Sequence, residues 1–263
     1  MKLAITGKGG VGKTTLTSLL AYQYASQGQT VLAIDADPSP CLGAALGFPR
    51  DSLAGLTPIS EMEELIYERT GAQPGTTGGF FKINPRVDDI PDRFAVTYRG
   101  IKLLELGAVE TGGSGCICPE SVMLKQLVSH ILLRRGEWVL LDMYAGVEHL
   151  GRATASAVDA MIAVVEPTRR SLGTAGQIKA LANDIGVSRI YLVGNKVQSD
   201  DDRRFLTENS PGLPVLGFLP YTAQAQEADR RGVPISDVSP ETALAVREIV
   251  AALDAQLQPV PVS

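Results

Sequence analysis

Short apolar runs alternate with longer segments of helical period along most of this chain. Most of the short runs are continuous stretches of Val, Ile and Leu, which is typical of parallel strands covered by helices on both faces. The alternation predicts an α/β fold: a doubly wound, mostly parallel sheet of about seven strands flanked by helices. The expected strands are 2–6, 30–35, 101–108, 138–143, 160–167, 189–196 and 214–220, and the expected helices are 13–27, about 59–70, 119–134, 152–158, 171–185, 200–208, 222–231 and 240–256.

Residues 71–100 depart from this alternation. The segment is rich in Gly and Pro, and loops of that length are usually functional or disordered. We expect a long ordered insertion there and a disordered tail at 258–263. Nothing elsewhere has the composition of a linker, so we expect a single domain over residues 1–263.

Charge and composition narrow the functional class. The net charge is −5 and the pI about 5.2, which predicts that the protein binds neither nucleic acid nor an anionic membrane surface. No apolar run approaches the roughly 20 residues that span a bilayer, and the first residues lack the pattern of a signal peptide. We therefore expect a cytoplasmic protein, in which three cysteines favour metal or redox chemistry over disulfides.

The first predicted strand runs directly into a glycine-rich loop, GKGGVGKTT at 7–15. It matches G-x-x-x-x-G-K-[ST] and precedes a helix, so backbone N–H groups and the helix N-terminus can surround a phosphate chain. In such a loop Lys13 reaches the β- and γ-phosphates and the Thr14 hydroxyl binds Mg²⁺. The expected nucleotide contacts are Gly7, Lys8, Gly9, Gly10, Val11, Gly12, Lys13, Thr14 and Thr15.

The same letters also satisfy the dinucleotide-binding pattern G-x-G-x-x-G. Asp35 follows about twenty positions later, as that fold requires. Lys13 and Thr14 decide between the two, because a dinucleotide site has no use for a cation and a hydroxyl directly after its third glycine. We therefore favour the P-loop.

Acidic residues end two of the predicted strands. Asp35 and Asp37 close the second strand, and Asp142 closes the strand at 138–143. Carboxylates at the carboxyl end of parallel strands are placed to hold Mg²⁺ or to orient an attacking water. Asp35 could equally have a structural role.

GKGGVGKT resembles the deviant P-loop of a group of partition, division-site, nitrogenase-iron-protein and metallochaperone ATPases. The resemblance implies that Lys8 crosses a dimer interface to the partner's nucleotide. It also implies that Asp37 in switch I positions the attacking water. In switch II it implies that Asp142 is linked to Mg²⁺ and that Gly146 senses the nucleotide. The expected catalytic residues are thus Lys8, Lys13, Asp37 and Asp142.

LVGNK at 192–196 looks like the base-recognition strand of the same group. The resemblance implies that Asn195 binds the purine edge, with Leu219 and Pro220 beside it. Residue 198 is Gln and not the Asp of a guanine-specific N-K-x-D, which favours ATP over GTP.

Two of the three cysteines, Cys116 and Cys118, form a C-x-C pair. In an extended segment both thiols point to one side, but a closed Zn²⁺ site takes four ligands. A two-fold dimer would bring four thiolates together, and Lys8 independently implies a dimer. We expect the pair to bind Zn²⁺ or Ni²⁺ across a homodimer, the alternative being two loop thiols without a ligand. Structural roles are expected for Cys41, as a small buried hydrophobe, and for His130 and His149.

Several further segments, among them GGSGCICPES, KINPRVDDIPDRF and DMYAGVEHLGRAT, resemble the CooC-type maturation ATPases. These serve carbon monoxide dehydrogenase and, in close relatives, acetyl-CoA synthase. The resemblance runs from the P-loop to about residue 220. It implies an ATP- and Mg²⁺-dependent homodimer that helps to deliver nickel to the metal cluster of its client. Tyr144 departs from the pattern, because a Gly or an acidic residue is expected there.

Two other functions stay open at this point. An iron–sulfur reductase like the nitrogenase iron protein would also use four cysteines of a dimer, although its ligands lie far apart in sequence. A positioning or partition ATPase needs a basic patch or a basic amphipathic helix, and the last predicted helix contains one Arg and no Lys.

Overall fold

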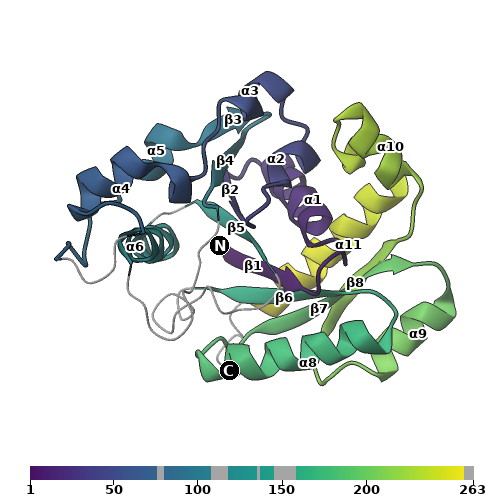
Figure 1. Ribbon diagram of the computed structural model, residues 1–263. Coiled ribbons are helices and arrows are strands. Elements are labelled where there is room, and N and C mark those ends of the chain that lie inside the picture. Colours follow the sequence, from purple (N-terminus) through teal and green to yellow (C-terminus); the bar gives the residue numbers. More distant parts are fainter. Residues whose placement is uncertain (76–79, 108–117, 135–136, 145–157, 258–263) are drawn as a thin grey trace.

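The computed structural model describes residues 1–75, 80–107, 118–134, 137–144 and 158–257 (Figure 1). Within these ranges one sheet has eight strands in the order β3-β4-β2-β5-β1-β6-β7-β8. All neighbouring strands are parallel except β3 and β4. This confirms the predicted doubly wound, mostly parallel sheet. The strands are β1 Lys2–Gly7, β2 Val31–Ala36, β3 Val96–Tyr98, β4 Ile101–Glu105, β5 Trp138–Met143, β6 Ala160–Val165, β7 Ile190–Val197 and β8 Val215–Pro220.

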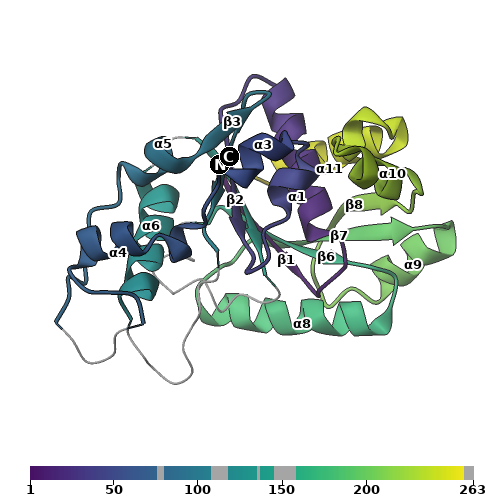
Figure 2. The ribbon, with the colours of Figure 1, turned by 45° about the horizontal axis from the view of Figure 1, so that its top comes forward.

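Helices cover both faces of the sheet (Figures 1 and 2). In β1 the side chains alternate between them: Leu3 and Ile5 join the core under α1 and α11, whereas Ala4 joins the core under α6 and α8. Both faces are therefore apolar, which explains the continuous Val, Ile and Leu runs. The helices are α1 Lys13–Ser26, α2 Leu42–Ala45, α3 Arg50–Ala54, η1 Ile59–Glu61, α4 Glu63–Thr70, α5 Ile90–Phe94, α6 Pro119–Arg134, α8 Arg169–Asp184, α9 Asp200–Glu208, α10 Gln224–Arg231, η2 Ile235–Asp237 and α11 Pro240–Leu257.

The segment at 71–100 contains regular structure that its composition did not indicate. Helix α5 lies there, and β3 adds an antiparallel edge strand that pairs with β4. The expected helix at about 59–70 is two elements, η1 and α4, separated at Met62. The expected helix 152–158, apart from its last residue, and the expected tail 258–263 lie outside the described residues.

Local sequence explains where helices α8 and α9 begin. Ser199 accepts a hydrogen bond from the backbone N–H of Asp202, and three aspartates follow it in the first turn of α9. Thr168 caps α8 in the same way through the N–H of Ser171. Such caps satisfy N–H groups that have no partner inside the helix, and acidic residues there complement its dipole.

Strand register gathers the polar strand ends at one edge of the sheet. Asp35 at the end of β2 lies opposite Asp142 at the end of β5, and Asp142 lies opposite Ile5 of β1. The P-loop follows β1 at the same edge, beside the point in the strand order from which the connections lead to opposite sides of the sheet. Ligands of open α/β sheets bind at such a point. In the described ranges no helix is both long and apolar enough to cross a membrane.

Candidate nucleotide-binding site

The P-loop connects β1 to α1 through residues 7–12. Gly10 and Gly12 have φ of 78° and 96°, a left-handed conformation that residues with a Cβ adopt at a cost. Gly12 also begins α1, because its carbonyl accepts the N–H of Leu16 at 3.0 Å. The loop therefore places its backbone N–H groups next to a helix N-terminus, an arrangement that suits a phosphate.

The two lysines of the loop have different surroundings. Lys13 is buried, with 9% exposure, and its Nζ lies 3.4 Å from the carbonyl oxygen of Lys8. Its ammonium group is thus held over the loop, where a phosphate chain would lie. Lys8 itself is exposed, as a residue must be if it is to reach a second molecule.

Asp142 is the most unusual charged residue of the site. Its side chain is 2% exposed, and its Oδ1 has no hydrogen-bond partner among the described residues. Burial raises the pKa of this carboxyl to about 7, although a hydrogen bond from Thr14 acts in the opposite direction. A buried carboxylate oxygen without a partner, next to the P-loop threonine, fits Mg²⁺, which prefers oxygen ligands. We infer that Thr14 and Asp142 would hold the ion directly or through its water.

Asp35 organises the loop that follows β2. Its carboxylate accepts hydrogen bonds from the backbone N–H groups of Asp37 at 3.0 Å and of Cys41 and Leu42 at 2.8 Å each. Of the two roles open to Asp35, these contacts favour the structural one. Asp37 is half-buried, and its Oδ1 accepts the N–H of Ser39 at 2.9 Å.

The expectation that Cys41 is a buried hydrophobe is wrong. Its side chain is exposed, while its backbone N–H is held by the carboxylate of Asp35. The sulfur lies 3.5 Å from Oγ1 of Thr14. Cys41 therefore belongs to the surroundings of the expected Mg²⁺ site.

Next to the P-loop lies a cavity of about 350 Å³, between the end of β7, β8 and the segment that leads into α10. Asn195, Leu219 and Pro220, the residues expected around the base, all line it. Nδ2 of Asn195 donates to the carbonyl of Val11 at 2.8 Å, and its Oδ1 accepts the N–H of Lys196. A purine would therefore meet the remaining N–H and lone pair of this amide. The lining also includes Gly10, Gly12, Thr15, Lys196, Tyr221, Thr222, Ala225, Gln226, Ile235 and Thr242.

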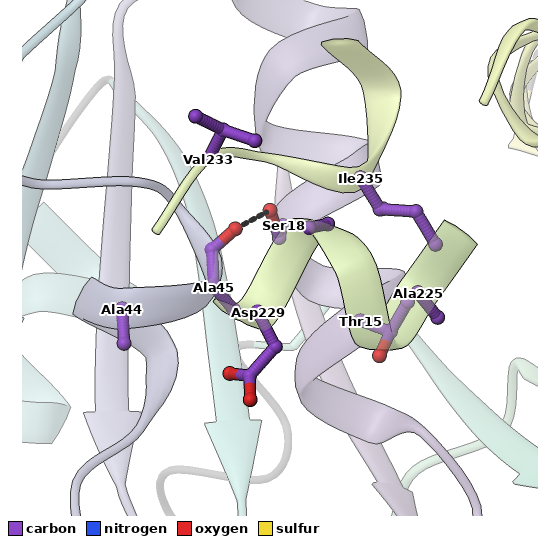
Figure 3. Close-up of a pocket in the computed structure, with 9 residues that line it drawn as sticks. Thr15, Ser18, Ala44, Ala45, Ala225, Asp229, Val233 and Ile235 are labelled. Carbon is purple, nitrogen blue, oxygen red and sulfur yellow. Dashed lines mark hydrogen bonds between the residues drawn. The ribbon is translucent and has the colours of Figure 1, made fainter. Parts of the chain in front are cut away.

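A second, smaller cavity of about 110 Å³ lies between α1, α2 and α10 (Figure 3). It shares Thr15, Ala225 and Ile235 with the first cavity. Ser18 lines this cavity, and its hydroxyl donates to the carbonyl oxygen of Ala45 at 2.8 Å (Figure 3). Helix α1 is thus tied at Ser18 to the end of α2, which follows the loop held by Asp35.

The cysteine pair is described only in part. Cys118 immediately precedes α6, and its thiol donates to Oγ of Ser121 at 2.9 Å. Cys116, Gly146 and His149 lie outside the described residues. His130 is half-buried on α6 and lines a groove with Arg86 and Gln126. No three His, Cys, Asp or Glu side chains of the described residues are grouped as a metal site.

Comparison with known proteins identifies the family. Residues 2–235 match the CobQ/CobB/MinD/ParA nucleotide binding domain. This chain belongs to that family. It is accordingly a P-loop ATPase, as the loop and its lysines predicted.

The relatives include proteins with closely similar sequences. Over 253 residues, 96% of both chains, the protein is 47% identical to the carbon monoxide dehydrogenase accessory protein CooC of Rhodospirillum rubrum. It is 45% identical to an ATP-binding protein of Methanocaldococcus jannaschii, over 90% of this chain and 91% of the relative. These similarities confirm the resemblance to CooC-type ATPases.

Solved structures share the fold at low sequence identity. The MinD cell division protein of Aquifex aeolicus has a TM-score of 0.67 at 22% identity and covers 99% of this chain, with 98% of its own chain matched. A plasmid partition protein of Borrelia burgdorferi bound to AMPPNP has a TM-score of 0.69 at 13% identity, over 97% and 98% of the two chains.

Proposed function

We propose that this protein is an ATP-driven metallochaperone that assists nickel insertion into carbon monoxide dehydrogenase or acetyl-CoA synthase. The observation that supports it most is the 47% identity to a carbon monoxide dehydrogenase accessory protein over nearly the whole chain. In this proposal the chain functions as one P-loop ATPase domain in the cytoplasm. The described thiols, Cys41 and Cys118, are free, which suits a reducing compartment.

Nucleotide binding is proposed to use the P-loop and the adjacent cavity. Lys13 and the loop N–H groups would hold the phosphates, and the cavity lined by Asn195, Leu219 and Pro220 would hold the adenine. Mg²⁺ supplies charge neutralisation on the phosphate oxygens when it is bound. Asp37 is the proposed carboxylate that orients the attacking water, because it follows β2 at the same sheet edge.

Homodimerisation is proposed to depend on Lys8. This lysine is exposed although it lies inside the P-loop, so its ammonium is available to the phosphates of a partner's nucleotide. An isologous interface would also bring both C-x-C pairs together. Cys116 and Cys118 of two subunits would then offer four thiolates to one Zn²⁺ or Ni²⁺ ion, which a single chain cannot do with its described residues. The metal ion is the cargo of this cycle.

The proposed cycle follows from these placements. ATP closes the dimer and assembles the thiolate site at the start of α6. Hydrolysis removes the γ-phosphate contacts of the two switch segments, which reset as in other nucleotide switches. The paired thiolates then separate, metal affinity falls, and the metal passes to the client.

A positioning role at a membrane receives less support. The apolar side chains Val246, Ile249 and Leu253 of α11 are buried against the protein itself. They are therefore unavailable for insertion into a lipid surface. Sedimentation with anionic liposomes in ATP would reverse this preference.

Metal stoichiometry with and without ATP is the deciding experiment. With a non-hydrolysable ATP analogue, the wild-type protein should elute as a dimer with about one metal ion per two chains by elemental analysis. Cys118→Ser should lose the metal and keep ATP binding. Lys8→Ala should bind ATP as a monomer with little turnover. Metal retained by Cys118→Ser would exclude the paired-thiolate site, and an iron–sulfur absorption band would favour the reductase instead.

A further inference from the structure

Two consecutive residues of β7 contact two consecutive carbonyls of the P-loop. Nδ2 of Asn195 donates to the oxygen of Val11 at 2.8 Å, and Nζ of Lys196 donates to the oxygen of Gly10 at 2.7 Å. In a regular strand successive side chains point to opposite faces. Both side chains can reach the same loop only if the strand is irregular at this point.

Lys196 provides that irregularity. Its φ is 58°, a left-handed conformation that is unfavourable for a residue with a Cβ. The pairing of β7 with β8 shifts register between Gly194 and Val197. The backbone N–H of Lys196 is held by Oδ1 of Asn195 at 2.8 Å. Such a conformation persists only where surrounding contacts impose it, which is often the case at a functional site.

The carbonyl groups of the P-loop need hydrogen-bond donors on the side where Asn195 and Lys196 lie. Gly10 and Gly12 have the left-handed φ that lets N–H groups of an anion-binding loop face one side. The carbonyls on the opposite side need donors of their own. Lys196 and Asn195 supply them, and Glu166 keeps the ammonium of Lys196 in place through an Oε2 atom 3.3 Å away.

We propose that Lys196 and Asn195 are positioning residues that hold the P-loop in its phosphate-binding shape. Although Lys196 lines the cavity proposed for the base, its ammonium is directed to the carbonyl of Gly10, and we assign its effect to that contact. The inference rests on the proposed use of the P-loop as the phosphate site. Its consequence is specific: losing the ammonium should weaken the binding of the phosphate chain and leave the contacts of the base and ribose intact.

The test compares ADP with adenosine. Lys196→Met removes a charge-assisted hydrogen bond, so we expect ADP to bind about tenfold more weakly by calorimetry. Adenosine affinity, measured by competition, should stay within about twofold. Lys179→Met is the matched control, because Nζ of Lys179 also donates to two carbonyls, those of Pro211 and Gly212, at 2.9 and 3.1 Å. This control should bind both ligands as the wild type does.

Two further substitutions of Lys196 distinguish the effect of its ammonium group from the effect of its left-handed backbone. Lys196→Arg keeps a donor and should recover most of the ADP affinity. Lys196→Gly removes the left-handed strain together with the ammonium. It should raise the melting temperature and still lose about tenfold in ADP affinity.

Three results would overturn the inference. Unchanged ADP affinity in Lys196→Met would remove the positioning role. Equal losses for ADP and adenosine would place Lys196 on the base instead. A general loss of stability in Lys196→Gly would make the residue merely structural. Lys13→Ala distinguishes the underlying assignment: if its ADP affinity equals that of the wild type, the P-loop is not the phosphate site and the positioning role falls with it.

Discussion

Replacing Asp142 with Asn should stabilise the nucleotide-free protein, and the gain should grow as pH rises. The carboxyl is 2% exposed, its Oδ1 has no partner within the part of the chain that the structure describes, and burial raises its pKa to about 7 from the ordinary value of 3.8. The native state therefore binds more protons than the unfolded state between these two values. In that window the stability of the wild type falls with rising pH, because unfolding releases a proton.

The size of the effect follows from the shift. About three pKa units at 1.36 kcal/mol each give a penalty of about 4 kcal/mol once the carboxyl is ionised in both states. Roughly 1.5 kcal/mol of it develops between pH 6 and pH 8, a range that avoids the pI. Asn carries no charge, so the variant lacks this loss. Any cost of the amide itself is the same at both pH values and cancels in the comparison.

Urea unfolding in EDTA at pH 6 and pH 8 measures this difference. We expect the stability of Asp142→Asn relative to wild type to be about 1.5 kcal/mol larger at pH 8. Glu248→Gln, which removes an exposed carboxylate from α11, should show no such difference. Asp142→Asn should also lose the stabilisation that Mg²⁺ and ATP give the wild type. An equal gain at both pH values would refute the reasoning, because it would show that the carboxyl is not a buried charge.

Three other predictions test the local architecture. Gly12→Ala should abolish ADP binding, because its Cβ would collide with the Asn195 amide. Adding Asn195→Ala should restore the binding only in part, since the left-handed φ of 96° at residue 12 remains unfavourable. Full restoration, measured by calorimetry, would contradict this prediction. Asp35→Ala should speed hydrogen exchange at the amides of Cys41 and Leu42 at least tenfold while β2 stays protected; unchanged exchange would remove its structural role. Ser199→Ala should lower the free energy of unfolding by about 1 kcal/mol through loss of the α9 cap, with ATP turnover unchanged.

The parts of the fold that could be predicted from sequence are those with strong local signals. Most of the seven predicted strands are continuous apolar runs, and the P-loop has a spacing that few other structures require. The eighth strand, β3, has three residues and lies at an edge. It has neither the length nor the burial that produces a recognisable run. Helices α2 and α3 are likewise shorter than the period that would reveal them.

The residues of the site also divide into those with a local sequence signal and those without one. Lys13, Thr14 and Asp142 were predicted because residue type and position in the motif imply their chemistry. The role of Lys196 has no sequence signal, because its contact joins residues 186 positions apart and depends on a left-handed backbone that a lysine does not indicate. The letters N-K predict only the base contact of Asn195.

The contacts of the site divide it into a satisfied part and an incomplete part. The carboxylate of Asp35 and the carbonyls of Gly10 and Val11 have their hydrogen bonds without any ligand. By contrast, one buried oxygen of Asp142 has no hydrogen-bond partner among the described residues, and Nζ of Lys13 contacts the carbonyl oxygen of Lys8. A cation and a phosphate would satisfy these two groups. In the proposed site the folding free energy lost at Asp142 would become available to ligand binding, because a bound ion would remove the penalty of the buried charge. In the proposed cycle, loss of the γ-phosphate would act on Lys13 and Asp142, the two groups that the phosphate and the ion would satisfy.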